Sequence, residues 1–316
     1  MKSSNQASLN QLLNSYGYLF FFVIIAIAGS IFTPNFISLN TLRNVLVQMT
    51  PVLITGLAMT IAISSGGLDI SIGSIMAVSS MCCAKTLSIG ILPAIVIGIT
   101  VGIFFGFVNG FIISRFKVEP IIITLATMIA GRGIAQVLNE GKVFIFYEPQ
   151  FTDWAFIRIG NIIPIQVLVM LIAILIIWFL VRRTVFGVYV QALGDNVKAA
   201  GIAGINTYAI TLVVYVICGI MAGVSGIMET SRLTIADASQ VGLGIEMDAI
   251  AAVALGGTPL TGGVANIFGT VIGCMTIQMI TVIINMNNLS TAYAYLMKGI
   301  VLILAICIQN LDVRGR

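Results

Sequence analysis

The chain of 316 residues offers few side chains that could catalyse a reaction or hold a metal ion. Histidine, the commonest metal ligand and a frequent general base, is absent. The cysteines lie in apolar runs without the paired spacing of a metal site, so we expect small core residues; they are Cys82, Cys83, Cys218, Cys274 and Cys307. This inventory disfavours catalysis at a buried site and predicts no metal site; no cofactor is expected.

A first group of polar residues interrupts an apolar stretch at Gly66–Ser74. Backbone that leaves a helix at membrane depth must be buried in protein or line water, so this break should face inward. Two interpretations of Asp69 are open: it caps the helix that starts at Ile72, or it lines a substrate path. The residues assigned to this break are Gly66, Gly67, Asp69, Ser71, Gly73 and Ser74.

A second glycine-rich break follows the short apolar run Ala249–Leu255. A half-helix followed by such backbone can build a polar site at membrane depth, whereas small residues also let helices pack closely. Both interpretations are open. The residues assigned to this break are Gly256, Gly257, Thr258, Gly262 and Gly263.

Two cations also interrupt apolar segments. Arg132 is flanked by glycines and is the better candidate for an inward hydrogen-bonding role. Lys298 is expected to extend its side chain to the membrane interface.

A third polar segment, Gly194–Ile205, is rich in alanine and glycine. Its composition favours a short helix with Asp195 or Asn196 as the N-cap and Gly204 near the end. Such a helix either presents small side chains to a partner or serves as an interfacial linker.

A membrane-embedded helix bundle must position these residues. Hydrophobic residues make up 59% of the chain and charged residues 8%, against roughly 25% charged in soluble domains, and the mean hydropathy is +1.11. We predict one all-α polytopic domain over 1–316, with the membrane bundle at 18–308 and a cytoplasmic loop at 182–207. At about 20 apolar residues a crossing, the ten expected segments, the eighth too short to span, are Tyr18–Phe32, Val45–Ser64, Ile72–Leu87, Ile91–Ile113, Ile121–Leu138, Pro164–Val181, Tyr208–Met228, Ala249–Leu255, Ile267–Ile284 and Tyr293–Ile308.

Basic residues set the predicted orientation, because they gather in cytoplasmic loops. The loops Asn139–Ile163 and Glu229–Asp248 then lie on the outer side, where Glu246 and Asp248 belong. The net charge of +4 is scattered, so we expect no nucleic-acid partner. An arrangement with both termini in the cytoplasm places these cations on the inner face: Arg115, Lys117, Arg182, Arg183, Lys198, Arg314 and Arg316.

Together these motifs resemble those of the ribose-type family of bacterial ABC sugar-importer permeases, which also handles arabinose, xylose, galactose, galactofuranose and the autoinducer sugar. The family carries Gly-Gly-(Ile/Leu)-Asp-(Leu/Ile)-Ser-(Val/Ile)-Gly-Ser, here Gly66–Ser74, and a Gly-x-Asn-x-x-Ala-Ala segment, here within Gly194–Ile205. Its third motif begins Glu-(Leu/Met)-Asp-Ala-Ile-Ala-Ala and corresponds to Glu246–Gly263. Three motifs in the family's order make the resemblance specific, and it covers nearly the whole chain.

The resemblance implies a permease in the bacterial inner membrane, with ATP hydrolysis on a separate ATPase subunit. In agreement, the sequence has no Gly-rich loop ending in Gly-Lys-Ser/Thr. The other implied partners are a periplasmic sugar-binding protein, received by the outer acidic loops, and a second permease, either another copy or a paralogue. The residues implied in coupling to the ATPase are Gly194, Asn196, Ala199, Ala200, Gly204 and Ile205.

Two details refine this resemblance. Pro259 stands where the family more often has serine, and Met128–Gln136 looks closest to the galactofuranose branch. The alternative function is a stand-alone secondary transporter driven by an ion gradient. Such proteins usually place several ionisable groups near the bilayer midplane, and Asp69 is the only carboxylate expected to reach it. The transported sugar cannot be read from the sequence.

Overall fold

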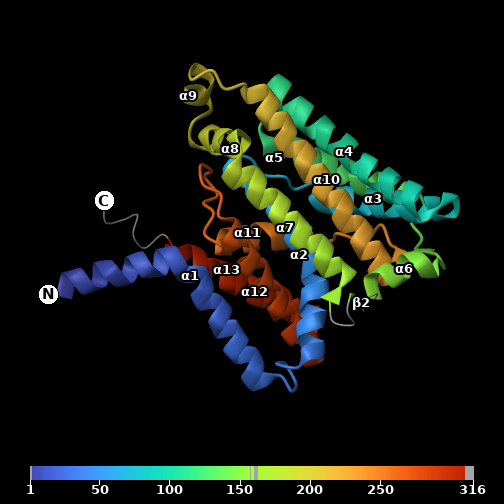
Figure 1. The fold of residues 1–316 in the computed structure, drawn as a ribbon, viewed down its shortest axis with the longest axis horizontal. Helices are drawn as coiled ribbons and strands as arrows, with labels where there is room; N and C mark the ends of the chain where they lie inside the picture. The colour runs from blue at the N-terminus through green and yellow to red at the C-terminus, as the bar shows by residue number, and fades with distance from the viewer. Residues whose placement is uncertain (1, 157, 160–162, 310–316) are drawn as a thin grey trace.

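The computed structural model describes residues 2–156, 158–159 and 163–309, and almost all of them are helical (Figure 1). The first seven helices along the chain are α1 (Lys2–Phe32), α2 (Leu39–Ser64), α3 (Ile72–Thr86), α4 (Ile91–Phe116), α5 (Pro120–Val137), α6 (Pro149–Phe156) and α7 (Ile165–Arg183). The remaining helices are α8 (Val185–Asp195), α9 (Val197–Ile202), α10 (Thr207–Leu233), α11 (Ile245–Leu255), α12 (Ile267–Met286) and α13 (Thr291–Gln309).

Two pairs of short strands lie in the loops between the helices. β1 (Phe144–Ile145) pairs antiparallel with β4 (Ile235–Ala236), which joins the loop after α5 to the loop after α10. β2 (Arg158–Ile159) pairs with β3 (Ile163–Pro164) just before α7. The pairing of β1 with β4 fixes the loop after α5 to the loop after α10, and both of these loops lie on the predicted outer side.

The prediction of a polytopic all-α membrane protein is confirmed. In the described part of the chain, seven helices are long and apolar enough to cross a membrane: α2, α4, α5, α7, α10, α12, and α3 with its short continuation to Ile89. Two shorter apolar helical stretches, Gly17–Phe32 and Thr291–Leu304, add to them. All ten predicted segments overlap helices, and the eighth, α11, has only 11 residues.

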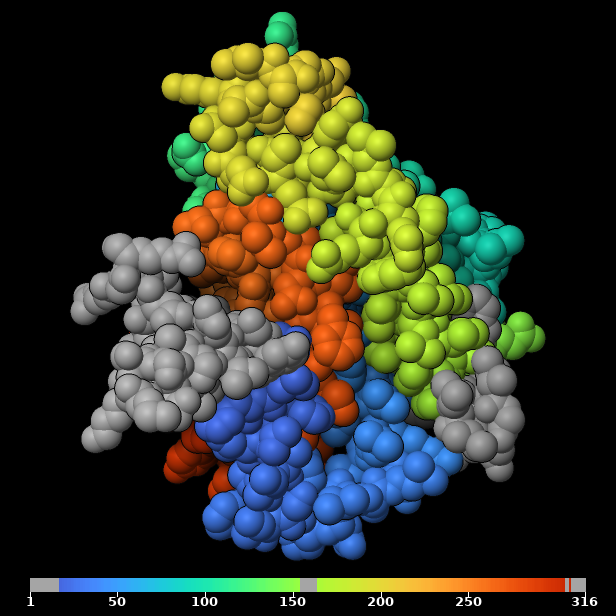
Figure 2. All heavy atoms as spheres, turned by 60° about the vertical axis from the view of Figure 1, so that its left-hand side comes forward, coloured from blue at the N-terminus to red at the C-terminus, as the bar shows by residue number. Residues whose placement is uncertain are grey.

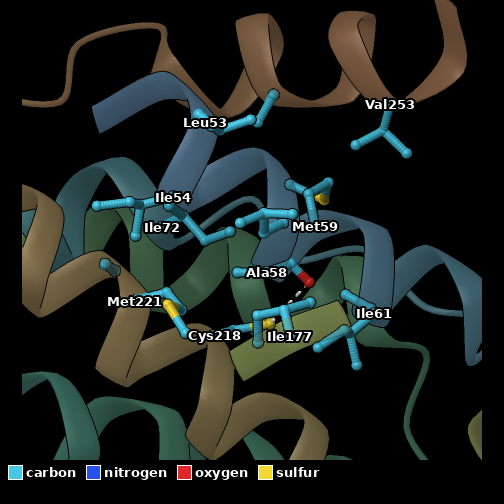
Figure 3. Packing of buried hydrophobic residues seen from close by; sticks show 14 of the residues in the cluster. Leu53, Ile54, Ala58, Met59, Ile61, Ile72, Ile177, Cys218, Met221 and Val253 are labelled. Carbon is cyan, nitrogen blue, oxygen red and sulfur yellow. Dashed lines mark hydrogen bonds between the residues drawn. The ribbon is translucent and has the colours of Figure 1, made fainter. Parts of the chain in front are cut away.

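Helix α2 forms the centre of the bundle. Its buried side chains pack with residues of α3, α7, α10 and α11, and Figure 3 shows Leu53, Ile54 and Met59 within this cluster. Cys218 of α10 lies 3.5 Å from the carbonyl oxygen of Ala58. Lipid tails are as apolar as leucine, so close packing rather than the hydrophobic effect holds such helices together.

Helices α4 and α10 show how that packing is achieved. They run side by side (Figure 1), and α4 presents Gly102 and Gly106 to the backbone of α10. A Cβ atom at Gly102 would collide with the carbonyl oxygen of Gly219, and one at Gly106 with that of Tyr215. Four-residue spacing of small residues therefore lets the two backbones touch.

The structure departs from the sequence-based expectations in three places. Helix α1 begins at Lys2 rather than at Tyr18, because hydropathy detects only the apolar part of a helix that continues through a polar lead-in. Helix α8 was not expected at all. Cys307 is exposed rather than in the core, and Cys82 is only partly buried.

Candidate functional site: a glycine junction and a polar cavity

The segment Gly194–Ile205 forms the expected short helix at one end of the bundle, beside α8. Asn196 is the N-cap, and its side-chain oxygen accepts a hydrogen bond of 3.0 Å from the amide of Ala199. Gly204 adopts a left-handed φ of 84° and ends the helix, where the amide of Ile205 bonds to the carbonyl of Ala200. Ala200 is buried, so the helix is held against the bundle on one side.

The chain leaves the helical conformation between Ser64 at the end of α2 and Ile72 at the start of α3. Gly66 has a φ of 83°, which a residue with a side chain rarely adopts. Its amide bonds to the carbonyl of Ile63, so the turn closes the end of α2.

Three separate motifs meet at this turn. The amide of Gly263 donates to the carbonyl of Ser64 at 3.1 Å, and the Ser64 hydroxyl donates to the carbonyl of Val264 at 2.8 Å. A Cβ atom at Gly194 would collide with the Ser64 carbonyl and the Gly263 amide. The space-filling view in Figure 2 shows the yellow and yellow-green atoms of α8 and α9 next to the orange atoms of the segment between α11 and α12. We call this contact the glycine junction, formed by Gly66, Gly194, Gly262 and Gly263.

The second break folds back on the start of α12. Asn266 caps α12 by accepting from the amide of Gly269, and its side-chain amide donates to the carbonyl of Gly256 at 2.8 Å. The Thr258 hydroxyl accepts from the amide of Asn266 at 3.1 Å. A Cβ atom at Gly256 would collide with the backbone of Gly269. Close packing therefore accounts for Gly256; Gly257 has a left-handed φ of 80° in the same turn.

Asp69 lies fully buried in the first break. Its carboxylate accepts from the amide of Ser71 at 3.0 Å and from the Ser71 hydroxyl at 2.5 Å. Asn109 of α4 donates to the same hydroxyl, and Thr127 of α5 donates to Asn109. Ser74 bonds to the carbonyl of Ser71. Asp69 does not cap α3 as expected, because Ser71 is the N-cap residue of that helix and no side chain among the described residues bonds to its first amides. Its carboxylate instead orders the turn before the helix, and a role in a substrate path stays a prediction.

The predicted inward bonding of Arg132 is confirmed. Its guanidinium donates to the carbonyls of Ala238 and Val241, both at 2.7 Å. It thereby holds the loop after α10 against α5. That loop also touches the start of α3, where a Cβ atom at Gly73 would collide with the carbonyl of Gly242.

The expectation that Lys298 reaches for the membrane interface is wrong. Its ammonium group lies 2.7 Å from the carboxylate of Asp248, with 11% of the lysine side chain and 21% of the aspartate side chain exposed. The short helix α11 brings this carboxylate beside α13, so the charge is neutralised where it stands. Glu246, two residues earlier, lies beside Gly73.

A polar cavity of about 190 Å³ lies between α2, α10, α11 and α12, away from the glycine junction. At its wall Arg232 pairs with Glu229 at 2.6 Å, and Gln278 donates to Gln48 at 3.2 Å. The cavity is lined by Gln48, Pro51, Val52, Met76, Glu229, Arg232, Gln240, Gly242, Leu243, Ile245, Asp248 and Gln278.

Sequence reasoning missed the amides in this cavity. Gln48 and Gln278 interrupt apolar helices, which is a usable signal because polar side chains in membrane helices usually face the bundle interior. Their convergence across 230 positions could not be foreseen. Among the described residues, no group of three or more His, Cys, Asp or Glu side chains could hold a metal ion.

Known proteins resemble the chain over nearly its full length. Residues 41–306 match the family of branched-chain amino acid transport system permease components. The ribose import permease protein of Escherichia coli K12 is 34% identical over 91% of each chain. The D-allose transport system permease protein of the same strain is 34% identical over 94% of this chain and 92% of its own.

The galactofuranose transporter permease protein of that strain is 32% identical over 84% of this chain and 79% of its own. Such similar identities do not favour the galactofuranose branch over the others. No solved structure is significantly similar to the chain. The matched region contains the glycine junction and the polar cavity. The chain therefore belongs to this family of permease components, among its ribose-type sugar-importer permeases.

Proposed function

We propose that the chain is the transmembrane permease subunit of a bacterial ABC importer for a monosaccharide, located in the inner membrane. Its relatives are named for the import of ribose, allose and galactofuranose. In this proposal a periplasmic binding protein delivers the sugar, a partner ATPase supplies the energy, and a second permease, identical or paralogous, completes the pore.

The glycine junction is the observation that carries the proposal. It joins Gly194, at the start of the coupling segment, to the end of α2 and to the turn before α12 without intervening side chains. Because the backbones touch directly at these glycines, no flexible side chain lies between them that could absorb a displacement. A push on the coupling segment is therefore passed to both helices.

The coupling segment also offers a surface for a partner. Ile202 of α9 is 90% exposed and Val197 is more than half exposed. In this proposal the partner ATPase covers these two apolar side chains. In this mechanism, closure of the ATPase dimer moves α9, the junction passes the movement to α2 and α12, and the sugar path opens alternately to each side.

The test uses the full chain in lipid nanodiscs with its partner ATPase and binding protein. Sugar-loaded binding protein should stimulate ATP hydrolysis. The substitutions Asn196→Trp and Ala199→Trp should abolish that stimulation, because they place bulk where the segment meets the ATPase. Sugar binding by the separate binding protein should not change.

The matched control is Leu175→Trp, which introduces the same side chain at an exposed position on α7. It should leave stimulation intact. Full stimulation in both coupling variants would contradict the proposed role of α9.

A further inference from the structure

We propose that the polar cavity between α2, α10, α11 and α12 is a binding site for the monosaccharide in transit, an inference that rests on the proposed import function. The cavity volume of about 190 Å³ is several times the space that one water molecule needs. It is therefore large enough for a single sugar ring.

The polar groups of the cavity match the hydroxyl groups of a sugar. Each sugar hydroxyl both donates and accepts, and the cavity supplies carboxylate acceptors from Glu229 and Asp248, guanidinium donors from Arg232, and amides that do both from Gln48 and Gln278. Charges of both signs are present in pairs, which favours a neutral polyhydroxylated ligand over an anion or a cation.

One donor in this wall is unused within the described structure. The Nε atom of Arg232 is buried and has no hydrogen-bond partner among the described residues, although the Nη2 atom of the same side chain binds Glu229. Such a donor is costly to bury alone. Because this atom has almost no accessible surface, a ligand hydroxyl in the cavity would reach it only after a change of the Arg232 rotamer.

Helices α2 and α12 link the wall of the cavity to the glycine junction. Helix α2 runs from Gln48 in the cavity wall to Ser64 in the junction, about 24 Å at 1.5 Å a residue. Helix α12 runs between Gln278 and the turn at Asn266.

These helices are clamped together between the two sites. The hydroxyls of Thr60 and Thr270 lie 2.7 Å apart, and Gly56 lies against Cys274. A shift at the junction is therefore carried by α2 and α12 together, and it moves Gln48 and Gln278 relative to Glu229 and Arg232 on α10, which is how a binding site could release its sugar.

The test compares transport with ATP hydrolysis in the complete transporter, reconstituted in liposomes with its ATPase and binding protein. The variants Gln278→Leu and Glu229→Gln should lower sugar uptake by about tenfold, the effect of losing one well-placed hydrogen bond or more. Stimulation of ATP hydrolysis by loaded binding protein should stay within about twofold of the wild type. Thr100→Val is the control: it keeps the shape of an exposed side chain on α4 whose hydroxyl bonds within its own helix, and it should leave both unchanged.

A second variant separates sugar binding from a purely structural ion pair. Exchanging the charges in Glu229→Arg with Arg232→Glu keeps an ion pair at this position but moves the donor and acceptor. Uptake should stay low in the exchanged variant. Normal uptake in the exchanged variant, or in both Gln278→Leu and Glu229→Gln, would overturn the proposed sugar site. Normal stimulation of ATP hydrolysis in the same variants would leave the import function intact.

A third measurement needs no partner protein. In the full-length permease with Cys82→Ala and Cys307→Ser, which removes the two thiols that are not buried, the variant Gln240→Cys places a thiol at the exposed rim of the cavity. Pentoses or hexoses at high concentration should slow its reaction with a polar maleimide several-fold, and glycerol at equal concentration should not. If no sugar protected the thiol, or if glycerol protected it equally, the proposed site would be overturned whatever the result of the ATPase experiment.

Discussion

Two cations inside this bundle, Lys298 and Arg132, have specific partners. Lys298 and Asp248 neutralise each other between α13 and α11, and Arg132 donates to two backbone carbonyls of the loop after α10. In lipid an ion without such a partner costs on the order of 3 kcal/mol even on lenient scales. These contacts therefore fix α13 to α11, and α5 to the loop after α10, at defined positions.

The substitution Lys298→Met should destabilise the protein more than loss of the whole pair. It leaves Asp248 as an unpaired, largely buried carboxylate, and breaking such a pair costs about 3 kcal/mol. The double variant with Asp248→Asn should recover most of that loss. Unfolding of the full chain in mixed detergent micelles measures both, and equal stability of the single and double variants would contradict the cost assigned to the unpaired Asp248 carboxylate.

Asp69 is predicted to order the turn between α2 and α3. The substitution Asp69→Ala removes the acceptor of the Ser71 amide and hydroxyl, at a cost of about 1–3 kcal/mol. Asp69→Asn keeps one acceptor oxygen and should cost less. Amide hydrogen exchange over 66–72 should quicken in the alanine variant. The control is Asp153→Asn at an exposed position, and identical exchange in all three variants would be evidence against this role.

At the scale of elements, the glycine junction is the feature most sensitive to added atoms. Gly194→Ala places a Cβ atom against the Ser64 carbonyl and the Gly263 amide, and overpacking of this kind costs about 1–3 kcal/mol. The variant should lose most of the ATP hydrolysis that loaded binding protein stimulates, with a lowered melting temperature. Gly133→Ala in α5 has open space around it and is the matched control. Normal stimulation in Gly194→Ala would mean that the junction does not transmit the movement.

The apolar runs predicted the membrane helices because each span needs a long stretch of apolar side chains, which hydropathy detects directly. Helix α8 gave no such signal, since its 11 residues are too short to span and it forms by packing against α7, α2 and α10. The capping residues of α9 were predictable because Asn196 and Gly204 act locally.

Contacts between distant segments could not be predicted from one sequence. Each glycine-rich motif was recognised separately, but nothing in the sequence says that Gly66, Gly194 and Gly262 touch. Lys298 was misjudged for the same reason, because its partner Asp248 lies 50 residues away on another helix. The cavity amides depend likewise on how α2 and α12 pack.

The whole molecule places two sites at different depths of one helix bundle. The glycine junction lies beside α8 and α9, at one end of the bundle in Figure 1. Residues farther along α2, α11 and α12 line the polar cavity. Close contacts such as Gly273 against Ala252 bind α11 and α12 between the two sites. This arrangement suits a subunit that receives force at one end and handles a ligand at the other.

The most direct test of the importer account is sugar uptake into liposomes that contain the complete transporter, with ATP and the ion gradients varied independently. We expect uptake that requires ATP on the side of the ATPase and sugar-loaded binding protein on the other, and that persists when ionophores collapse every gradient. Uptake that proceeds without ATP and stops when an ion gradient is collapsed would contradict this account and establish a stand-alone secondary transporter.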